Sequence, residues 1–203
     1  IKDILKEYAV MSEGKWQLNP ELKQNLTESA HNKMIYLLAL LGEKMGFDIW
    51  IGQKEQGVAY NKIKLDSLIT IKKPIWRFVP TTNWNRVNQI DVIWHEEGRI
   101  AFEFEVENTT AITEAIARGS NIPHNHLKRI IVIPKERENF LYRKMKDPMI
   151  NENIVKNEWK FIFYQDLEDL FSRKKKLKKE DFEKLFKPPK ETRQNQNSLN
   201  IYL

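Results

Sequence analysis

The sequence lacks cysteine, long apolar runs and any segment that resembles a signal peptide. Without cysteine, the chain has neither a disulfide framework nor a cysteine-based zinc site. No apolar run approaches the roughly 18–20 residues that span a bilayer, and the N-terminal residues do not follow the pattern of a secretion signal. We therefore expect a cytoplasmic protein without a membrane partner. Because the chain begins at Ile1 and not at Met, we expect a trimmed chain or a piece of a longer protein.

The chain instead has an excess of basic residues. It contains 34 Lys and Arg against 28 Asp and Glu among 203 residues, a net charge of +6. Basic proteins favour polyanions as partners, because neutralising phosphates releases counterions. Much of the excess lies in residues 173–179, which a solvated helix face also explains. Charge alone therefore supports DNA binding only weakly.

The spacing of apolar residues predicts one main domain at residues 20–170. An N-terminal helical extension (1–19, with a helix over 1–11) precedes it, and a basic helix and polar tail (171–203) follow it. The core begins with a long helix over 20–46, capped by Asn19 with Pro20 in the first turn. Further patterns predict strands at 47–51, 89–94, 100–108, 129–134 and 159–164, and helices at 109–118, 137–149 and 167–171. This order predicts an α/β fold with a central mixed β-sheet flanked by helices.

Aromatic and basic residues are mixed in the loop-like segment before the second strand. Trp76 and Trp84 lie there among four basic residues, Lys72, Lys73, Arg77 and Arg86. Such a mixture suits contact with nucleic acid by stacking and phosphate pairing. The alternative is that these aromatic residues fill a small satellite core.

Alternating glutamates mark the strand at 100–108. Ile100, Phe102, Phe104 and Val106 point to one face, and Glu103, Glu105 and Glu107 point to the other. A turn centred on Glu97 places Asp91 opposite Glu103, and cross-strand partners share a face. Four carboxylates on one face are either fully solvated or neutralised by a cation. Hard divalent cations such as Mg²⁺ prefer such oxygen ligands.

Two strings in this hairpin resemble the active site of the PD-(D/E)XK nuclease superfamily. They are Ile90-Asp91-Val92-Ile93-Trp94 and Ala101-Phe102-Glu103-Phe104-Glu105-Val106-Glu107-Asn108-Thr109-Thr110. The resemblance covers roughly residues 20 to 165 and implies a restriction endonuclease-like core of order αβββαβ. The chain departs from the family pattern because Glu107 stands where a lysine is usual, or Glu105 does if the motif starts at Glu103. Glu or Gln replaces that lysine in some active restriction enzymes, so catalysis remains compatible with the sequence.

The resemblance implies roles for the residues that match the motif. Asp91 and Glu105 would hold Mg²⁺, or alternatively Mn²⁺, with Glu103 as an alternative ligand. Glu107 would orient or deprotonate the attacking water. The long helix can add another acid, for which we choose Glu28, whereas His31 on the same helix face is expected to be structural.

The residues that follow the hairpin give two further expectations. Arg118 and Asn121 are candidates for DNA phosphate contacts, although a surface ion pair explains Arg118 equally well. His124 and His126 lie two apart in a loop, and we do not expect them to bind zinc.

The sequence thus favours a Mg²⁺-dependent endodeoxyribonuclease that hydrolyses double-stranded DNA, restriction-like and working as a homodimer. Two-fold symmetry suits two-strand cleavage. Three alternatives remain: a structure-specific or repair nuclease, a DNA-binding module with a decayed nuclease site, and an interaction domain with a solvated acidic face.

Overall fold

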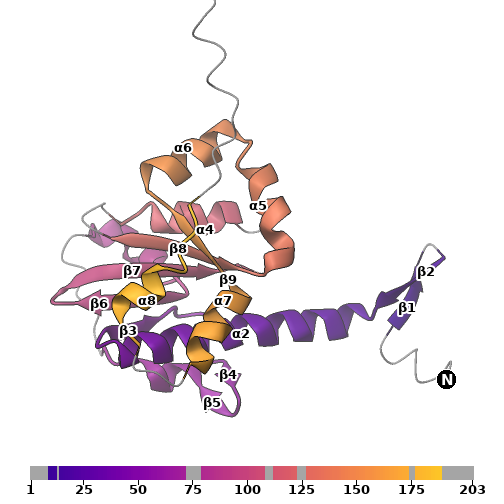
Figure 1. The fold of residues 1–203 in the computed structure, drawn as a ribbon, viewed down its shortest axis with the longest axis horizontal. Coiled ribbons are helices and arrows are strands. Elements are labelled where there is room, and N and C mark those ends of the chain that lie inside the picture. Colours follow the sequence, from indigo (N-terminus) through magenta and orange to yellow (C-terminus); the bar gives the residue numbers. More distant parts are fainter. Residues whose placement is uncertain are drawn as a thin grey trace, which may run out of the picture.

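A five-stranded mixed β-sheet forms the centre of the protein in the computed structural model (Figure 1). The structure describes residues 9–12, 14–71, 79–107, 112–122, 127–173 and 177–188. The strand order is β3-β6-β7-β8-β9; the pairs β3–β6 and β6–β7 are antiparallel, and the pairs β7–β8 and β8–β9 are parallel. The strands are β3 (Asp48–Ile51), β6 (Val92–Glu96), β7 (Arg99–Val106), β8 (Lys128–Ile133) and β9 (Lys160–Phe163). The predicted α/β class with a central mixed sheet is confirmed.

One face of the sheet is covered by α2 (Pro20–Lys44), α7 (Tyr164–Ser172) and α8 (Lys179–Glu183). Their apolar side chains pack against strand residues that include Trp94, Phe102 and Phe104. The helix α2 approaches β6 at Gly42, where a Cβ would lie 2.5 Å from the indole nitrogen of Trp94. That nitrogen donates a hydrogen bond to the Leu38 carbonyl at 3.1 Å. A glycine is required here because no larger side chain fits between the helix and the strand.

The opposite face is covered by α4 (Ile112–Gly119), α5 (Glu138–Lys144), α6 (Pro148–Lys156) and the short α3 (Trp84–Val87). Its apolar residues form two clusters, one over β8 and β9 and the other over β6. Between them, β7 places Glu103 and Glu105, and β8 adds Arg129, all fully buried. A strip of buried charge therefore divides the packing of this face, which costs stability unless the charges are paired.

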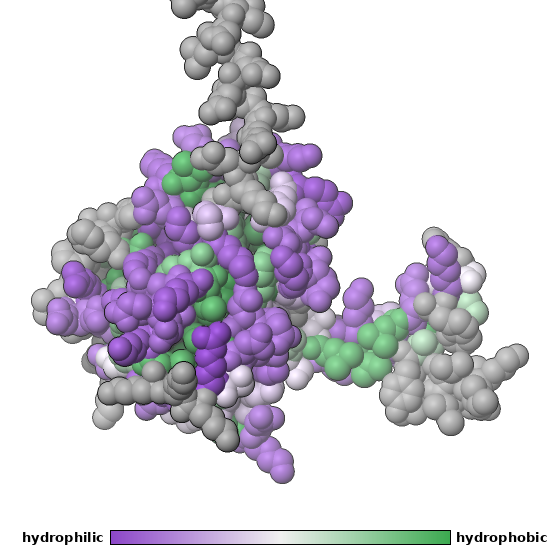
Figure 2. Space-filling model, in the orientation of Figure 1, coloured by the Kyte–Doolittle hydropathy of each residue, from purple (hydrophilic) through white to green (hydrophobic). Residues whose placement is uncertain are grey.

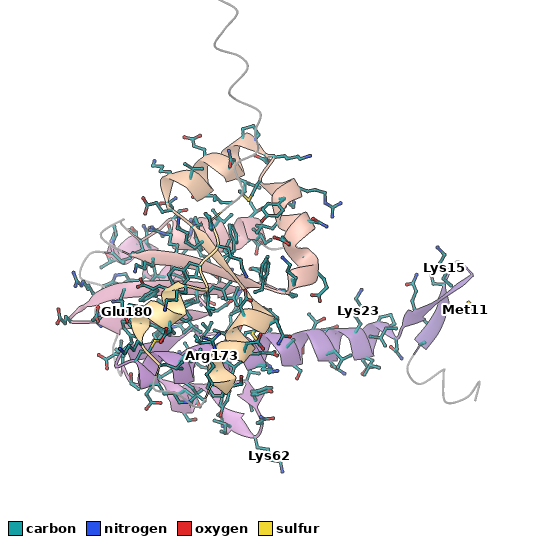
Figure 3. All side chains as sticks on the ribbon, viewed as in Figure 1. Met11, Lys15, Lys23, Lys62, Arg173 and Glu180 are labelled. Atoms are coloured by element: carbon teal, nitrogen blue, oxygen red, sulfur yellow. The ribbon has the colours of Figure 1, made fainter. Side chains whose placement is uncertain are left out.

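Residues 9–18 form a β-hairpin at the start of α2, made of β1 (Ala9–Ser12) and β2 (Lys15–Leu18). The hairpin and the first turns of α2 form an arm that extends away from the sheet, and Figure 3 shows Met11, Lys15 and Lys23 along it. Figure 2 shows apolar residues along the same arm, and Met11 and Leu26 are each 55% exposed. The predicted helical extension is wrong for these residues. Gly14 adopts a φ of 74°, a left-handed conformation that reverses the chain instead of continuing a helix.

The predicted helix over 137–149 is wrong as a single element. The 3₁₀ helix η3 (Lys135–Arg137) leads into α5, and α6 then begins at Pro148 after a turn. Asp147 caps α6, because its carboxylate accepts a hydrogen bond from the Met149 N–H at 2.9 Å. Proline interrupts a helix interior but is suited to a first turn. The predicted helix over 20–46 is confirmed as α2, and the 109–118 prediction matches α4 from Ile112 onward.

The remaining elements are short. They are β4 (Ala59–Tyr60), β5 (Ile63–Lys64), η1 (Leu65–Leu68) and η2 (Thr81–Asn83). Most of the predicted polar tail lies outside the described residues, and of the predicted basic helix the structure shows α8. Within the part of the chain that the structure describes, no helix combines the length and apolar character needed to cross a membrane.

Candidate active site

The β6–β7 hairpin has a register that the sequence alone did not give. Its turn uses Glu97 and Gly98, both at positive φ (49° and 80°), and a β-bulge follows at Trp94 and His95. Each feature moves the pairing by one residue from the simple register. Two such shifts together preserve which side chains share a face. Between the turn and the bulge, only one of the two shifts applies, so side chains there point to the opposite face from the one the simple register predicts. Ile100 therefore packs with the cluster over β6 and not beside Phe102, as the alternation had predicted.

Asp91 still joins the glutamates, as predicted, but with a different neighbour. Ile93 faces Glu103 across the strands, so Asp91 lies level with Glu105, and the predicted pairing with Glu103 is wrong. The Oδ2 atom of Asp91 accepts a hydrogen bond from the Val106 N–H at 2.7 Å. This bond fixes the aspartate against the end of β7.

All four carboxylates of this face are buried. The exposed fractions are 6% for Asp91, 0% for Glu103, 0% for Glu105 and 5% for Glu107. A fully solvated acidic face, one of the two sequence interpretations, is therefore wrong. Buried carboxylates need positive partners, because removing each charge from water costs roughly several kcal/mol even after the protein has relaxed around it.

Arg118 of α4 is the partner of Glu105. Its Nε and Nη2 atoms donate to the two oxygens of Glu105 at 2.9 and 2.5 Å, and Nη2 lies 3.8 Å from Oε1 of Glu107. Burial raises the pKa of Glu105 well above its ordinary value, and the charge of Asp91 adds to this rise while Arg118 opposes it. The ion pair that was the alternative for Arg118 is present, but it is not a surface pair, because Glu105 is fully buried and the Arg118 side chain is 21% exposed. A phosphate contact stays a prediction.

Arg129 of β8 is the partner of Glu103. Its Nε lies 3.2 Å from Oε1 of Glu103, and it donates to the carbonyls of Gly119 at 3.3 Å and Ile122 at 2.5 Å. Burial raises the pKa of Glu103 to about 7, although Arg129 opposes the rise. The pair therefore anchors the end of α4, the helix that carries Arg118. Glu103 itself does not line the pocket of this site.

A pocket of about 430 Å³ opens beside the other three carboxylates, between α2, the loop after β3 and the end of β7. Asp91, Glu107 and Arg118 line it, together with His31 and Glu55. Nδ1 of His31 lies 2.9 Å from the Val106 carbonyl oxygen, and Nε2 lies 3.6 Å from Oε2 of Glu55. One ligand atom each from His31, Glu55 and Asp91 lies within 4.8 Å of the others.

The charges around this pocket influence one another strongly. Burial and the neighbouring Asp91 raise the pKa of Glu107 to about 7, against the opposing effect of Arg118 and His31. Burial also raises the pKa of Asp91, and His31 opposes it most. Burial alone would lower the pKa of His31, but Glu55 and Asp91 raise it above its ordinary value. The pocket therefore attracts positive charge.

Other predicted site residues lie at the edge of this site or away from it. Glu28 lines the pocket but is exposed, and its Oε1 accepts a hydrogen bond from Nε2 of Gln24 at 2.8 Å. Asn121 does not line the pocket; its Nδ2 donates to the carbonyls of Ala117 and Arg118 at the end of α4. Arg86 is exposed on α3. Five residues lie outside the described ranges: Lys72, Lys73, Arg77, His124 and His126.

Sequence reasoning missed three residues that the structure brings to the acidic face. His31 was expected to be structural, yet its ring contacts Val106, 75 residues away. Arg129 opens an apolar strand, and an arginine buried there needs a charged partner; this was an available signal. Glu55 lies in a loop without any motif, so no local signal identified it.

The fold and site define an α/β domain with a buried acidic cluster, two arginine partners and an open pocket. A family model described as the C-terminal domain of the type II restriction enzyme NmeDI matches residues 17–187, and the chain belongs to this family. The type II restriction enzyme NmeDI of Neisseria meningitidis serogroup C is 25% identical over 152 residues, which cover 70% of this chain and 42% of that enzyme. The chain thus spans less than half the length of this relative. No solved structure matches it.

Proposed function

We propose that this chain is a restriction endonuclease-like domain that hydrolyses phosphodiester bonds in double-stranded DNA with the help of Mg²⁺ or a similar dication. The PD-(D/E)XK interpretation with Asp91, Glu105 and Glu107 as its acidic residues belongs to this proposal. Its main support is one observation: at the end of the central strand β7, Asp91 and Glu107 line the pocket together with Arg118, which bonds both oxygens of Glu105. Membership of a restriction enzyme family agrees with it.

The donor set fits a hard dication. Asp91 and Glu107 are buried carboxylates that line the pocket, and no residue in the described part of the chain donates a hydrogen bond to Glu107. Oxygen atoms of this kind are preferred ligands of Mg²⁺. When bound, such an ion polarises the scissile phosphate and stabilises the charge that develops on it.

The residues of the chain supply the remaining chemistry. Glu107, with a pKa of about 7, is suited to accept the proton of the attacking water near neutral pH. Arg118 offers guanidinium N–H groups at the pocket wall, where they can pair with a phosphate oxygen. The carboxylate of Asp91 accepts a hydrogen bond from the backbone N–H of Val106, which holds it in position for the reaction.

The proposal includes a homodimer in which two such sites act on the two strands of a DNA duplex. A second candidate, a DNA-binding module whose nuclease site has decayed, is favoured by two observations. Both oxygens of Glu105 are already bonded to Arg118, and Glu107 stands where the family resemblance expects a lysine.

Incubation of a supercoiled plasmid with the chain tests the proposal. We expect nicking or linearisation with Mg²⁺ or Mn²⁺, complete inhibition by EDTA, and at least a hundredfold loss in Asp91→Asn and Glu107→Gln. Glu180→Gln is the matched control and should cleave like the wild type, because Glu180 is an exposed residue of α8 (Figure 3) that does not line the pocket. Sedimentation of the chain with a DNA duplex reports the dimer.

The other outcomes separate the alternatives. Intact plasmid with DNA binding retained in all variants would support the decayed module. Preference for branched over linear duplexes would support a structure-specific nuclease. Cleavage that persists unchanged in both acidic variants would refute the assignment of the site.

A further inference from the structure

The pocket contains a nitrogen ligand that an all-oxygen magnesium site does not need. His31 projects from α2 toward the acids, and its Nδ1 lies 2.9 Å from the Val106 carbonyl oxygen. A carbonyl oxygen can only accept, so the hydrogen lies on Nδ1. The lone pair of the neutral ring is then on Nε2, on the side that faces Glu55. A backbone carbonyl that fixes one nitrogen and leaves the other free is the usual support of a metal-binding histidine.

The spacing of the atoms fits ligands of one ion better than direct bonds between them. Nε2 of His31 and Oε2 of Glu55 are 3.6 Å apart, too far for a good hydrogen bond. Metal–ligand bonds of about 2.1 Å place neighbouring ligand atoms about 3.0 to 3.5 Å apart. Asp91 completes the group, since all three ligand atoms lie within 4.8 Å of one another. Small side-chain rotations would bring them onto one ion.

A second observation points to a cation in the same pocket. Glu107 is only 5% exposed and lines the same pocket. Its nearest described cation is Nη2 of Arg118 at 3.8 Å, which is already bonded to Glu105. A buried carboxylate that lacks a hydrogen bond from the described residues carries a desolvation cost that a bound cation removes.

We propose that His31, Glu55 and Asp91 bind a transition-metal dication such as Mn²⁺, and that His31 makes this site prefer Mn²⁺ over Mg²⁺. Imidazole is a ligand of transition metals, whereas Mg²⁺ is bound mainly by oxygen. The inference deepens the proposed function, because it names the metal class and two further ligands of the same site. Asp91 is then shared with the acids of β7.

Metal binding without DNA tests this inference. We expect Mn²⁺ to bind the wild-type chain at least tenfold more tightly than Mg²⁺ in calorimetric titrations. His31→Gln should lose at least tenfold in Mn²⁺ affinity with a much smaller change for Mg²⁺, and Glu55→Gln should weaken both. Glu180→Gln is the control. Circular dichroism of the metal-free variants shows whether each one is folded.

Pulsed EPR of bound Mn²⁺ gives a readout that does not depend on affinity. The wild type should show electron spin echo modulation from an imidazole ¹⁴N nucleus, and folded His31→Gln should lack it. The comparison is needed because the chain has 4 histidines. Absence of the modulation in the wild type, its persistence in His31→Gln, or equal affinity for the two metals would overturn the inference. Plasmid cleavage with Mg²⁺ would stand in each of those cases, so the two proposals fail separately.

Discussion

Replacement of Arg118 by methionine is expected to destabilise the protein in a way that depends on Glu105. Methionine keeps most of the length of the side chain but removes the guanidinium that bonds both oxygens of Glu105. Glu105 is 0% exposed, so its charge would be left in the interior without a partner. Removing one member of a buried ion pair costs about 3–5 kcal/mol of unfolding free energy. We expect a loss in this range at pH 8.

The loss should shrink at low pH. In the wild type, Arg118 opposes the rise in the pKa of Glu105 that burial causes. Without it, the folded-state pKa rises further above the unfolded value, so the folded variant binds a proton that the unfolded chain releases. The unfolded state is the same in both proteins, so the stability of the variant relative to the wild type falls only as pH rises from the folded-state pKa of the wild type, which burial already raises, towards the still higher pKa of the variant. The loss at pH 5 should be clearly smaller than the loss at pH 8.

Urea unfolding measured at pH 5 and pH 8 checks these expectations. The double variant Arg118→Met with Glu105→Gln removes the orphaned charge, and it should recover most of the loss at pH 8. Lys33→Met is the control, because Lys33 pairs with Glu168 at 2.7 Å but both side chains are about one third exposed. Such a surface pair is worth about 0–1 kcal/mol. The reasoning is refuted if Arg118→Met costs no more than Lys33→Met, or if the double variant is as unstable as the single one.

Three further predictions follow from the same strip of buried charge. Glu107→Gln should stabilise the metal-free protein by about 1–3 kcal/mol at pH 8 and little at pH 5. The reason is that the folded pKa of Glu107 is about 7, so the wild-type protein loses stability as pH rises from the unfolded pKa of about 4.3 through 7. Equal effects at both pH values in urea titrations would contradict this. Gly119→Ala should cost at least about 1–3 kcal/mol, since the new Cβ would lie 2.0 Å from Oε1 of Glu103 and 2.6 Å from the ring of Trp159; an unchanged melting temperature would exclude such a clash. Arg129→Met should cost about 3–5 kcal/mol, with a coupling above about 1 kcal/mol to Glu103→Gln in a double-mutant cycle; additive effects would show that the two side chains do not act as a pair.

Much of the fold was predictable because its signals are local. The helical spacing of Leu37, Leu38 and Leu41 predicted α2, with Asn19 as the cap that the structure shows. The apolar run of β8 predicted a strand covered on both faces. The helix over 137–149 was misjudged because Pro148 suits a first turn as well as it breaks a helix, and the sequence does not say which applies.

The acidic face was predictable in part. Alternation along β7 determined that Glu103, Glu105 and Glu107 share a face, and the hairpin brought Asp91 to it. The register was not predictable, because the bulge at Trp94 and His95 depends on packing and not on a sequence signal. That register decided which carboxylate lies level with Asp91.

The sequence by itself determined a hairpin with four carboxylates on one side, since the period of a strand is a property of neighbouring residues. Only the tertiary structure decided that these carboxylates are buried, that Arg118 pairs with Glu105 and Arg129 with Glu103, and that His31 and Glu55 reach the same pocket as Asp91 and Glu107. Each of these contacts joins segments separated by at least 13 residues, as Arg118 and Glu105 are, and by as many as 75, as His31 and Val106 are. Their distances follow from how helices pack on the sheet, which no local pattern in the chain specifies.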